Sequence, residues 1–191
     1  MFFVGIFGRE ILGHSLPLLS KLLEDKTRRL HGHLQRMFAN MPNDINNFTA
    51  TSEAKLLNQT LFEDIDWLLL ISANVLSIGN DPFDTIPSEI MNYSIQQTTS
   101  GAVDITTSLK VLASPTQCIS EIPNGENATD HVIRLISAVF RLCEIEKLAG
   151  EAKMGGCLSP EVSCTLMYFL KMWVNSYLLP LPEFYSTVRI N

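Results

Sequence analysis

The sequence LFEDIDWLLLISANVL occupies residues 61–76, and its apolar residues recur at the spacing of an α-helix. One face of this helix is formed by Ile65, Leu68, Leu69, Ser72 and Leu76. Three acids, Glu63, Asp64 and Asp66, make its middle acidic. Because Gly79 is a natural stop signal, we expect a long helix over residues 52–78.

Helical periodicity also dominates the rest of the chain, and no run alternates strictly between apolar and polar residues as a strand would. Loops are expected over 39–51 and 114–128, where proline and asparagine mark turns. A proline inside a helix loses a backbone hydrogen bond, so Pro17 is expected to break or kink the first helix. The expected helices cover residues 2–38, 52–78, 87–98, 103–113, 130–149 and 160–179.

Several of these helices carry capping signals at their ends. Pro87 suits the first turn of its helix, where the missing N–H costs little. Thr129 can cap the helix that Gly150 is expected to end. The last helix has the strongest start, because a hydroxyl residue, Ser159, is followed directly by Pro160.

The helices predict an all-α fold, but two architectures fit their lengths. A HEAT-type repeat protein would consist of antiparallel helix pairs recurring about every 40–47 residues. No self-similar period of that kind is visible in the sequence. A compact helical bundle fits the same helix lengths almost as well.

The net charge bounds the kinds of partner that the chain can bind. The formal net charge is −6 and the isoelectric point is near 5.2. A protein that binds the phosphate backbone needs excess Lys and Arg, so we expect no nucleic-acid partner. An acidic surface is better suited to basic protein partners.

The cysteines and sequons do not decide between an intracellular and a secreted protein. The four cysteines form no C-x-x-C pair, which favours buried thiols of a cytosolic or nuclear protein. The alternative is a secreted helical glycoprotein, supported by the even cysteine count and by sequons at Asn47, Asn58, Asn92 and Asn127. Arg9 and Glu10 interrupt the apolar start, so neither a signal peptide nor membrane insertion is expected.

No residue pattern points to an enzyme, a metal site or a cofactor site. His31 and His33 are two residues apart and would lie on different faces of a helix. Adjacent acids such as those at 63–66 splay apart, so a solvated helix face explains them better than catalysis. Trp67 and Trp173 fit core positions on helical stripes. There is no glycine-rich phosphate loop and no nucleophile elbow.

Four blocks, in this order and spacing, resemble the importin-β-like (karyopherin-β) nuclear transport receptors, and specifically their export receptors. They cover residues 61–76, 86–95, 103–109 and 130–141. Shorter similar blocks lie at 17–19, 22–24, 29–36, 144–146, 158–160 and 177–179. The resemblance implies that residues 1–191 are a single internal segment of a HEAT-like α-solenoid, an α-α superhelix of antiparallel helix pairs.

The resemblance also implies a binding function. Receptors of this family bind cargo together with the small GTPase Ran in its GTP form, contact nuclear pore proteins, and shuttle between nucleus and cytoplasm. Ran-GTP is expected to bind repeats outside these residues. As candidate contacts for a basic cargo protein we take Glu63, Asp64, Glu144 and Glu146. A stand-alone cytosolic helical scaffold, unrelated to transport, remains a further alternative.

Overall fold

The computed structural model of the chain describes residues 2–39, 52–77, 86–114 and 117–178. Within these ranges the chain is helical, with eight α-helices and no β-strand. The all-α fold class predicted from the periodicity is therefore confirmed. The expected loop at 39–51 and the stop at Gly79 lie almost wholly outside the described residues.

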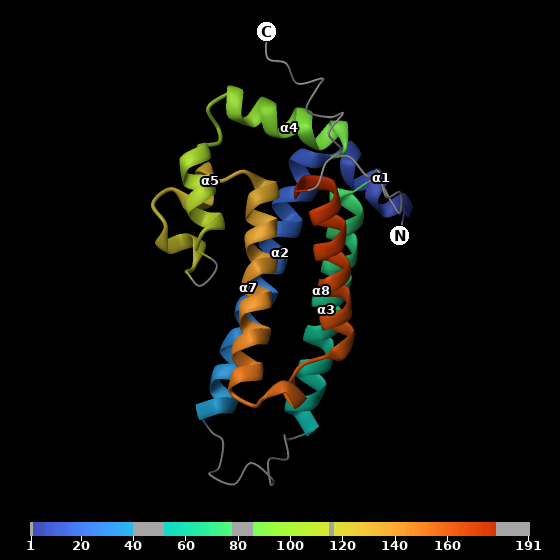
Figure 1. The fold of residues 1–191 in the computed structure, drawn as a ribbon, viewed down its shortest axis with the longest axis vertical. Coiled ribbons are helices and arrows are strands. Elements are labelled where there is room, and N and C mark those ends of the chain that lie inside the picture. Colours follow the sequence, from blue (N-terminus) through green and yellow to red (C-terminus); the bar gives the residue numbers. More distant parts are fainter. Residues whose placement is uncertain (1, 40–51, 78–85, 115–116, 179–191) are drawn as a thin grey trace.

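Four long helices form two antiparallel hairpins (Figure 1). The first hairpin consists of α2 (Leu12–Ala39) and α3 (Ser52–Leu76), and the second of α7 (His131–Glu151) and α8 (Pro160–Trp173). The hairpins lie side by side, because α2 packs on α7 and α3 packs on α8. Helices α2 and α7 both end at the lower end of Figure 1, where α3 and α8 begin. The first helices of the two hairpins thus pack on each other, and so do the second helices, which fits a helical-repeat fold of antiparallel pairs.

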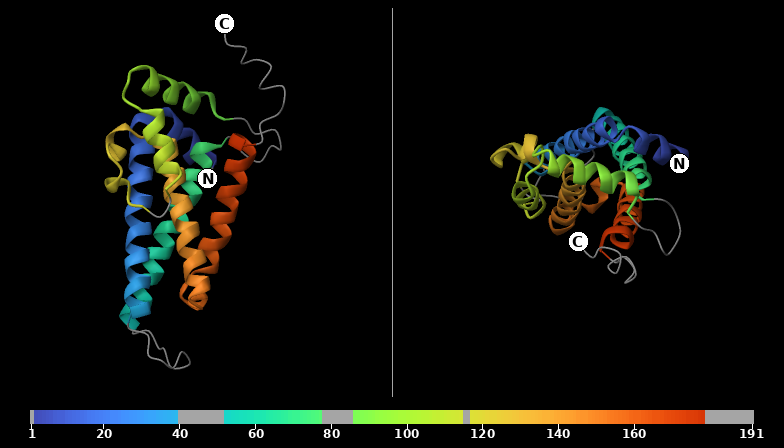
Figure 2. Two further views of the ribbon diagram at one scale, coloured as in Figure 1. Left: turned by 60° about the vertical axis from the view of Figure 1, so that its left-hand side comes forward. Right: turned by 90° about the horizontal axis from the view of Figure 1, so that it is seen from above.

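Three shorter helices separate the two hairpins: α4 (Ser88–Thr99), α5 (Ile105–Leu112) and α6 (Gly125–Ala128). Helix α4 lies across the upper end of the long helices, as Figure 2 shows, and α5 packs against α7. The second hairpin therefore starts only at His131. This insertion explains why no regular repeat period is visible in the sequence.

The hydrophobic core fills the space between the two hairpins. Helix α2 contributes Leu16, Leu23 and Leu30, which recur every seven residues and are fully buried. The other long helices contribute fully buried side chains of the same kind, including Ile65, Leu69, Leu135, Leu142, Leu166 and Phe169. Because each such side chain stabilises the fold by roughly 1.5–3 kcal/mol on burial, the stacked hairpins depend on one another.

The helical stretch expected over 2–38 is present, but its break lies at Ile11 and not at Pro17. The chain turns at Ile11, between α1 (Phe2–Glu10) and α2, and Pro17 lies inside α2. The turn is closed by the Ser15 hydroxyl, which donates to the carbonyl of Gly8 at 2.6 Å. The break falls there because α1 leaves the axis of α2 to pack against α3.

The carbonyl end of α3 is capped by side chains that are distant in the sequence. The Arg9 guanidinium is buried, and its Nη1 donates to the carbonyls of Asn74 (2.7 Å), Val75 (3.2 Å) and Ser77 (3.0 Å). The Tyr177 hydroxyl donates to the carbonyl of Leu76 at 3.1 Å. The last carbonyls of a helix have no partner within the helix, so these donors supply it.

Helices α3, α4, α5 and α7 begin and end within a few residues of the predicted ranges 52–78, 87–98, 103–113 and 130–149. Helix α8, predicted over 160–179, begins at Pro160 but ends at Trp173. Ser159 caps α8 as predicted, with its hydroxyl accepting from the N–H of Val162. Beyond Trp173 the chain continues as a π-helix over Val174–Leu178, which carries Tyr177.

Four details of the predicted helix ends and loops are wrong. Asp130, and not Thr129, caps α7, because its carboxylate reaches the N–H groups of two following residues. The Thr129 hydroxyl instead donates to the carbonyl of Gly125 at 2.6 Å, and α7 continues through Gly150 to Glu151. Pro87 is the N-cap of α4 and not its first helical residue. The loop expected over 114–128 contains α6 and a 3₁₀ turn over Ile119–Glu121.

Candidate functional site

The four acids predicted to contact cargo lie on two helices and have different surroundings. On α3, Glu63 is exposed, whereas Asp64 forms an ion pair with Lys26 of α2, with 2.5 Å between Nζ and Oδ2. The acids therefore diverge, as adjacent residues on a helix do. A partner could reach Glu63 without breaking a contact between helices, but binding to Asp64 would compete with Lys26.

The two acids of α7 are also engaged within the protein. Glu144 pairs with Lys147 at 3.3 Å within the same helix. Glu146 is half-buried and accepts a hydrogen bond from the hydroxyl of Ser163 in α8 at 2.8 Å. Burial raises the pKa of Glu146, although the hydrogen bond from Ser163 partly offsets this. Asp64 thus faces α2 and Glu146 faces α8.

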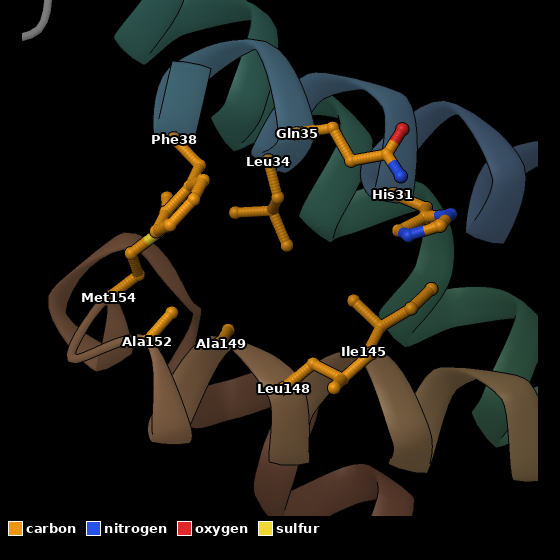
Figure 3. Close-up of a pocket in the computed structure, with 9 residues that line it drawn as sticks. All are labelled: His31, Leu34, Gln35, Phe38, Ile145, Leu148, Ala149, Ala152 and Met154. Carbon is orange, nitrogen blue, oxygen red and sulfur yellow. The ribbon is translucent and has the colours of Figure 1, made fainter. Parts of the chain in front are cut away.

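An apolar groove lies between the lower ends of α2 and α7 (Figure 3). It has a volume of about 280 Å³, and we call it the α2–α7 groove. Phe38 and Leu148 line it although they are 58% and 45% exposed. The remaining lining residues are His31, Leu34, Gln35, Ile145, Ala149, Ala152 and Met154.

A second apolar groove, of about 470 Å³, runs between α4, α5, α7 and the π-helix. Four of its lining residues are large apolar side chains more than half exposed: Ile95, Ile105, Leu109 and Leu178. Exposed apolar surface of this kind is typical of protein–protein contact sites. Periodicity could not reveal it, because an apolar stripe in the sequence looks the same whether or not the fold covers it.

The two tryptophans, both expected in the core, differ in burial. Trp173 is half-buried at the second groove and packs edge-on against Phe140, with ring centroids 5.3 Å apart. Trp67 is 54% exposed, so its core assignment is wrong. On α3 it lies next to the face whose side chains, including Ile65, Leu68 and Leu69, are buried in the core.

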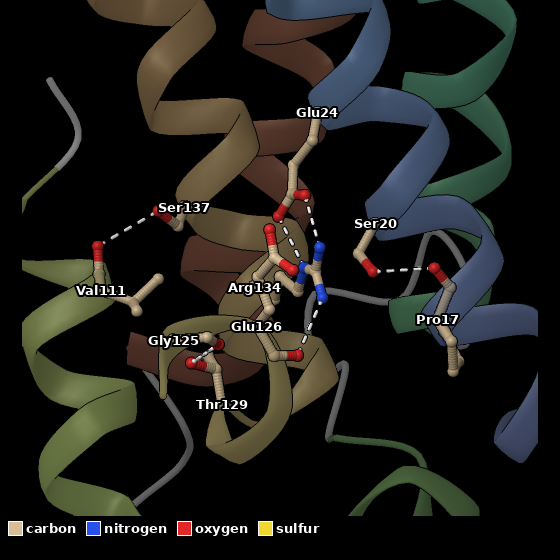
Figure 4. Close-up of polar contacts among 9 residues, drawn as sticks. All are labelled: Pro17, Ser20, Glu24, Val111, Gly125, Glu126, Thr129, Arg134 and Ser137. Carbon is tan, nitrogen blue, oxygen red and sulfur yellow. Dashed lines mark hydrogen bonds and ion pairs between the residues drawn. The ribbon is translucent and has the colours of Figure 1, made fainter. Parts of the chain in front are cut away.

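The strongest polar contact between the hairpins joins α2 to α7 (Figure 4). Arg134 donates from Nε and Nη2 to the two carboxylate oxygens of Glu24, each at 2.7 Å. Its Nη1 also donates to the carbonyl of Glu126 at 3.2 Å. The hydrogen bonds to Glu24 raise the pKa of Arg134. The side chains of this pair are only 14% and 16% exposed, so it holds the two hairpins together more than it offers a binding site.

The histidines and cysteines form no cluster with a ligand-binding geometry. His31 lines the α2–α7 groove, whereas His33 faces α3, so the two point to different sides of α2 as predicted. Cys118, Cys143, Cys157 and Cys164 are all free thiols. Burial raises the pKa of Cys143 to about 11, which makes it a poor nucleophile. Within the described ranges, no group of three or more His, Cys, Asp or Glu side chains could hold a metal ion.

No family model matches the chain. Among the helices that the structure describes, none combines the length and the apolar character needed to cross a membrane.

Proposed function

We propose that the chain is an internal segment of a nuclear export receptor of the exportin-4 type, within the importin-β-like family. In this proposal it is a binding protein and not an enzyme. The observation that supports it best is the parallel stacking of the α2–α3 and α7–α8 hairpins. Such stacking repeated along a chain builds a curved solenoid with a long surface for protein partners. The ordered blocks that resemble the receptors lie on both hairpins and on the helices between them.

Transport by such a receptor is coupled binding without bond making or breaking. Cargo protein and Ran-GTP each favour the same curvature of the solenoid, so each raises the affinity for the other. Ran-GTP binds repeats beyond these residues, and nuclear pore proteins bind the receptor during passage. The receptor then shuttles between nucleus and cytoplasm.

The acidic positions remain the proposed contacts for a basic cargo, with Glu63 foremost because it is exposed. For Glu144 to bind cargo, only its ion pair with Lys147 in the same helix would have to break. Asp64 and Glu146 would contribute mainly through their charge, since both bind other helices. An octalysine peptide is a suitable probe. The E63K/E144K variant should bind it more weakly and with less dependence on salt; an unchanged affinity would exclude these positions.

The length of the cellular protein tests the proposal and its alternatives together. An antibody raised against residues 52–78 should detect a band many times heavier than 21.4 kDa. A band near that mass that shifts after glycosidase treatment would indicate the secreted glycoprotein instead. A band near that mass without a shift would indicate a stand-alone scaffold.

A further inference from the structure

A basic groove runs between α2 and α3, on the side of α2 that faces α3. It is lined by four nitrogenous side chains of α2, namely Lys26, Arg29, His33 and Arg36. They follow one another at spacings of three, four and three residues, which places them on a single face of the helix. The groove has a volume of about 440 Å³.

The charge of this groove is opposite to that of the chain. Lys26, Arg29 and Arg36 carry three positive charges, and Asp64 is the single carboxylate among the lining residues. The chain as a whole has a formal net charge of −6. The groove is therefore a local positive site in an acidic protein, where the field favours an anionic ligand.

The two arginines are held only by weak contacts. Arg29 is 64% exposed and pairs with Asp25, four residues earlier on α2, at 2.8 Å. Exposed pairs of this kind contribute little to stability, so the guanidinium can exchange Asp25 for another carboxylate. Arg36 is exposed and donates from Nε to the carbonyl of Gly32 at 3.1 Å, one turn earlier.

His33 lines the same groove, between Arg29 and Arg36 on the same face of α2. Its Nε2 atom is buried and has no hydrogen-bond partner among the described residues. The wall opposite is formed by Thr60, Leu61 and Asp64 of α3, which makes the groove concave and partly apolar.

We propose that this groove binds an acidic peptide segment of a partner protein, with Arg29 and Arg36 contacting its carboxylates. Arginine suits this role because its planar fork binds a carboxylate through two parallel hydrogen bonds. A short acidic segment fits a concave groove in which three cationic side chains outnumber the single carboxylate, Asp64. A nucleic acid would extend beyond the groove and be repelled by the acidic remainder of the chain. The inference does not depend on nuclear transport.

Fluorescence anisotropy of a labelled octaglutamate peptide on the full 191-residue chain tests the proposal. The test variant is R29E/R36E. The matched control is K21E/R28E, which changes the charge by the same amount at two exposed residues on the other side of α2. The test variant should bind at least about tenfold more weakly and with less salt dependence, whereas the control should stay within about twofold. The neutral variant R29Q/R36Q should fall between the wild type and R29E/R36E.

Equal weakening by the two charge-reversal variants would overturn the proposal, because binding would then follow net charge and not the groove. No binding of octaglutamate to the wild-type chain would overturn it as well. Anionic lipid vesicles and single-stranded DNA serve as comparison ligands. Tighter binding of either one, lost in R29E/R36E, would assign the groove to that other class of partner. An unchanged circular dichroism spectrum would show that the variants remain folded.

Discussion

Gly5 and Gly8 lie one turn apart on α1, where this helix packs on α3. A Cβ atom added to Gly5 would lie 2.1 Å from the carbonyl oxygen of Asn74. A Cβ atom added to Gly8 would lie 2.6 Å from Cγ2 of Val75. Both distances are well below van der Waals contact, so the close approach of α1 to α3 depends on the absence of side chains at these two positions.

We therefore expect G5A to destabilise the protein by about 1–3 kcal/mol, because the new methyl group meets rigid backbone. G8A should cost less, since the side chain of Val75 can rotate. The control is G32A in the C-terminal third of α2, where an added Cβ meets no atom within 4 Å. This substitution should stabilise the protein by up to about 1 kcal/mol. Urea denaturation of the three variants is the measurement, and a loss of stability in G32A equal to that in G5A would contradict the explanation.

Glu146 should make stability depend on pH. Burial raises its pKa above the value of 4.5 expected in the unfolded chain, so the folded state binds the proton more tightly. The stabilisation of the folded state by protonated Glu146 is therefore fully present below pH 4.5 and is lost as the pH rises through the raised pKa. In E146Q the amide oxygen can still accept from Ser163 but does not titrate. The variant should melt at a higher temperature than wild type at pH 7 and at the same temperature at pH 4, and a constant difference across this range would contradict the assignment.

At the scale of the helix, the end of α3 shows how much depends on contacts between distant segments. Its carbonyls are satisfied by Arg9 from α1 and by Tyr177 from the π-helix. Burial raises the pKa of Tyr177, so the hydroxyl keeps its proton and remains a donor. The three segments are thus coupled at one point.

Y177F should lower the free energy of unfolding by about 1 kcal/mol, the usual cost of one lost hydrogen bond. R9M should cost about 2–3 kcal/mol, because a charged donor to several carbonyls is lost while the side-chain volume is largely kept. In both variants, the backbone amides in the last turn of α3 should exchange hydrogen faster than in the wild type. If the amides of α8 away from the π-helix were the ones to lose protection instead, the capping role would be refuted.

These helix ends also show what the sequence can predict. Ser159 and Pro160 were correctly predicted to start α8, because a cap and the backbone groups it satisfies lie within one turn. The start of α7 was misplaced by one residue, since Thr129 and Asp130 are both good caps and tertiary contacts decide between them. The break at Ile11 and the cap by Arg9 could not be predicted, because both depend on where α3 ends in space.

For the whole molecule, the important feature is that one hairpin stacks on a second hairpin that follows it only after three inserted helices. Helical periodicity was sufficient to predict an all-α chain, but the insertion concealed the repeat. Only one wall of the basic groove could be predicted from the sequence, because its basic residues on α2 recur at helical spacing. The opposite wall comes from α3 and depends on how the two helices pack. Neither of the exposed apolar grooves could be predicted from the sequence.

The ion pair of Glu24 with Arg134 joins the two hairpins, so it tests their mutual dependence. R134L should cost about 3 kcal/mol, because it leaves a largely buried carboxylate without a partner. The double variant E24L/R134L should recover much of this loss, since neither charge remains. D25N, which removes a partly exposed carboxylate whose ion pairs lie within α2, should change stability by less than about 1 kcal/mol. Thermal unfolding measures all three, and additive losses in the double variant would show that the pair is not coupled.

In the proposed function, this chain belongs to a receptor whose binding is controlled by Ran. The most direct measurement is precipitation of the endogenous protein, with an antibody raised against the whole chain, from cell extract supplied with Ran loaded with either GTP or GDP. Immunoblotting then measures the Ran recovered. The proposed function predicts that Ran is recovered in its GTP form and not in its GDP form. Equal recovery of both forms, or of neither, would contradict it.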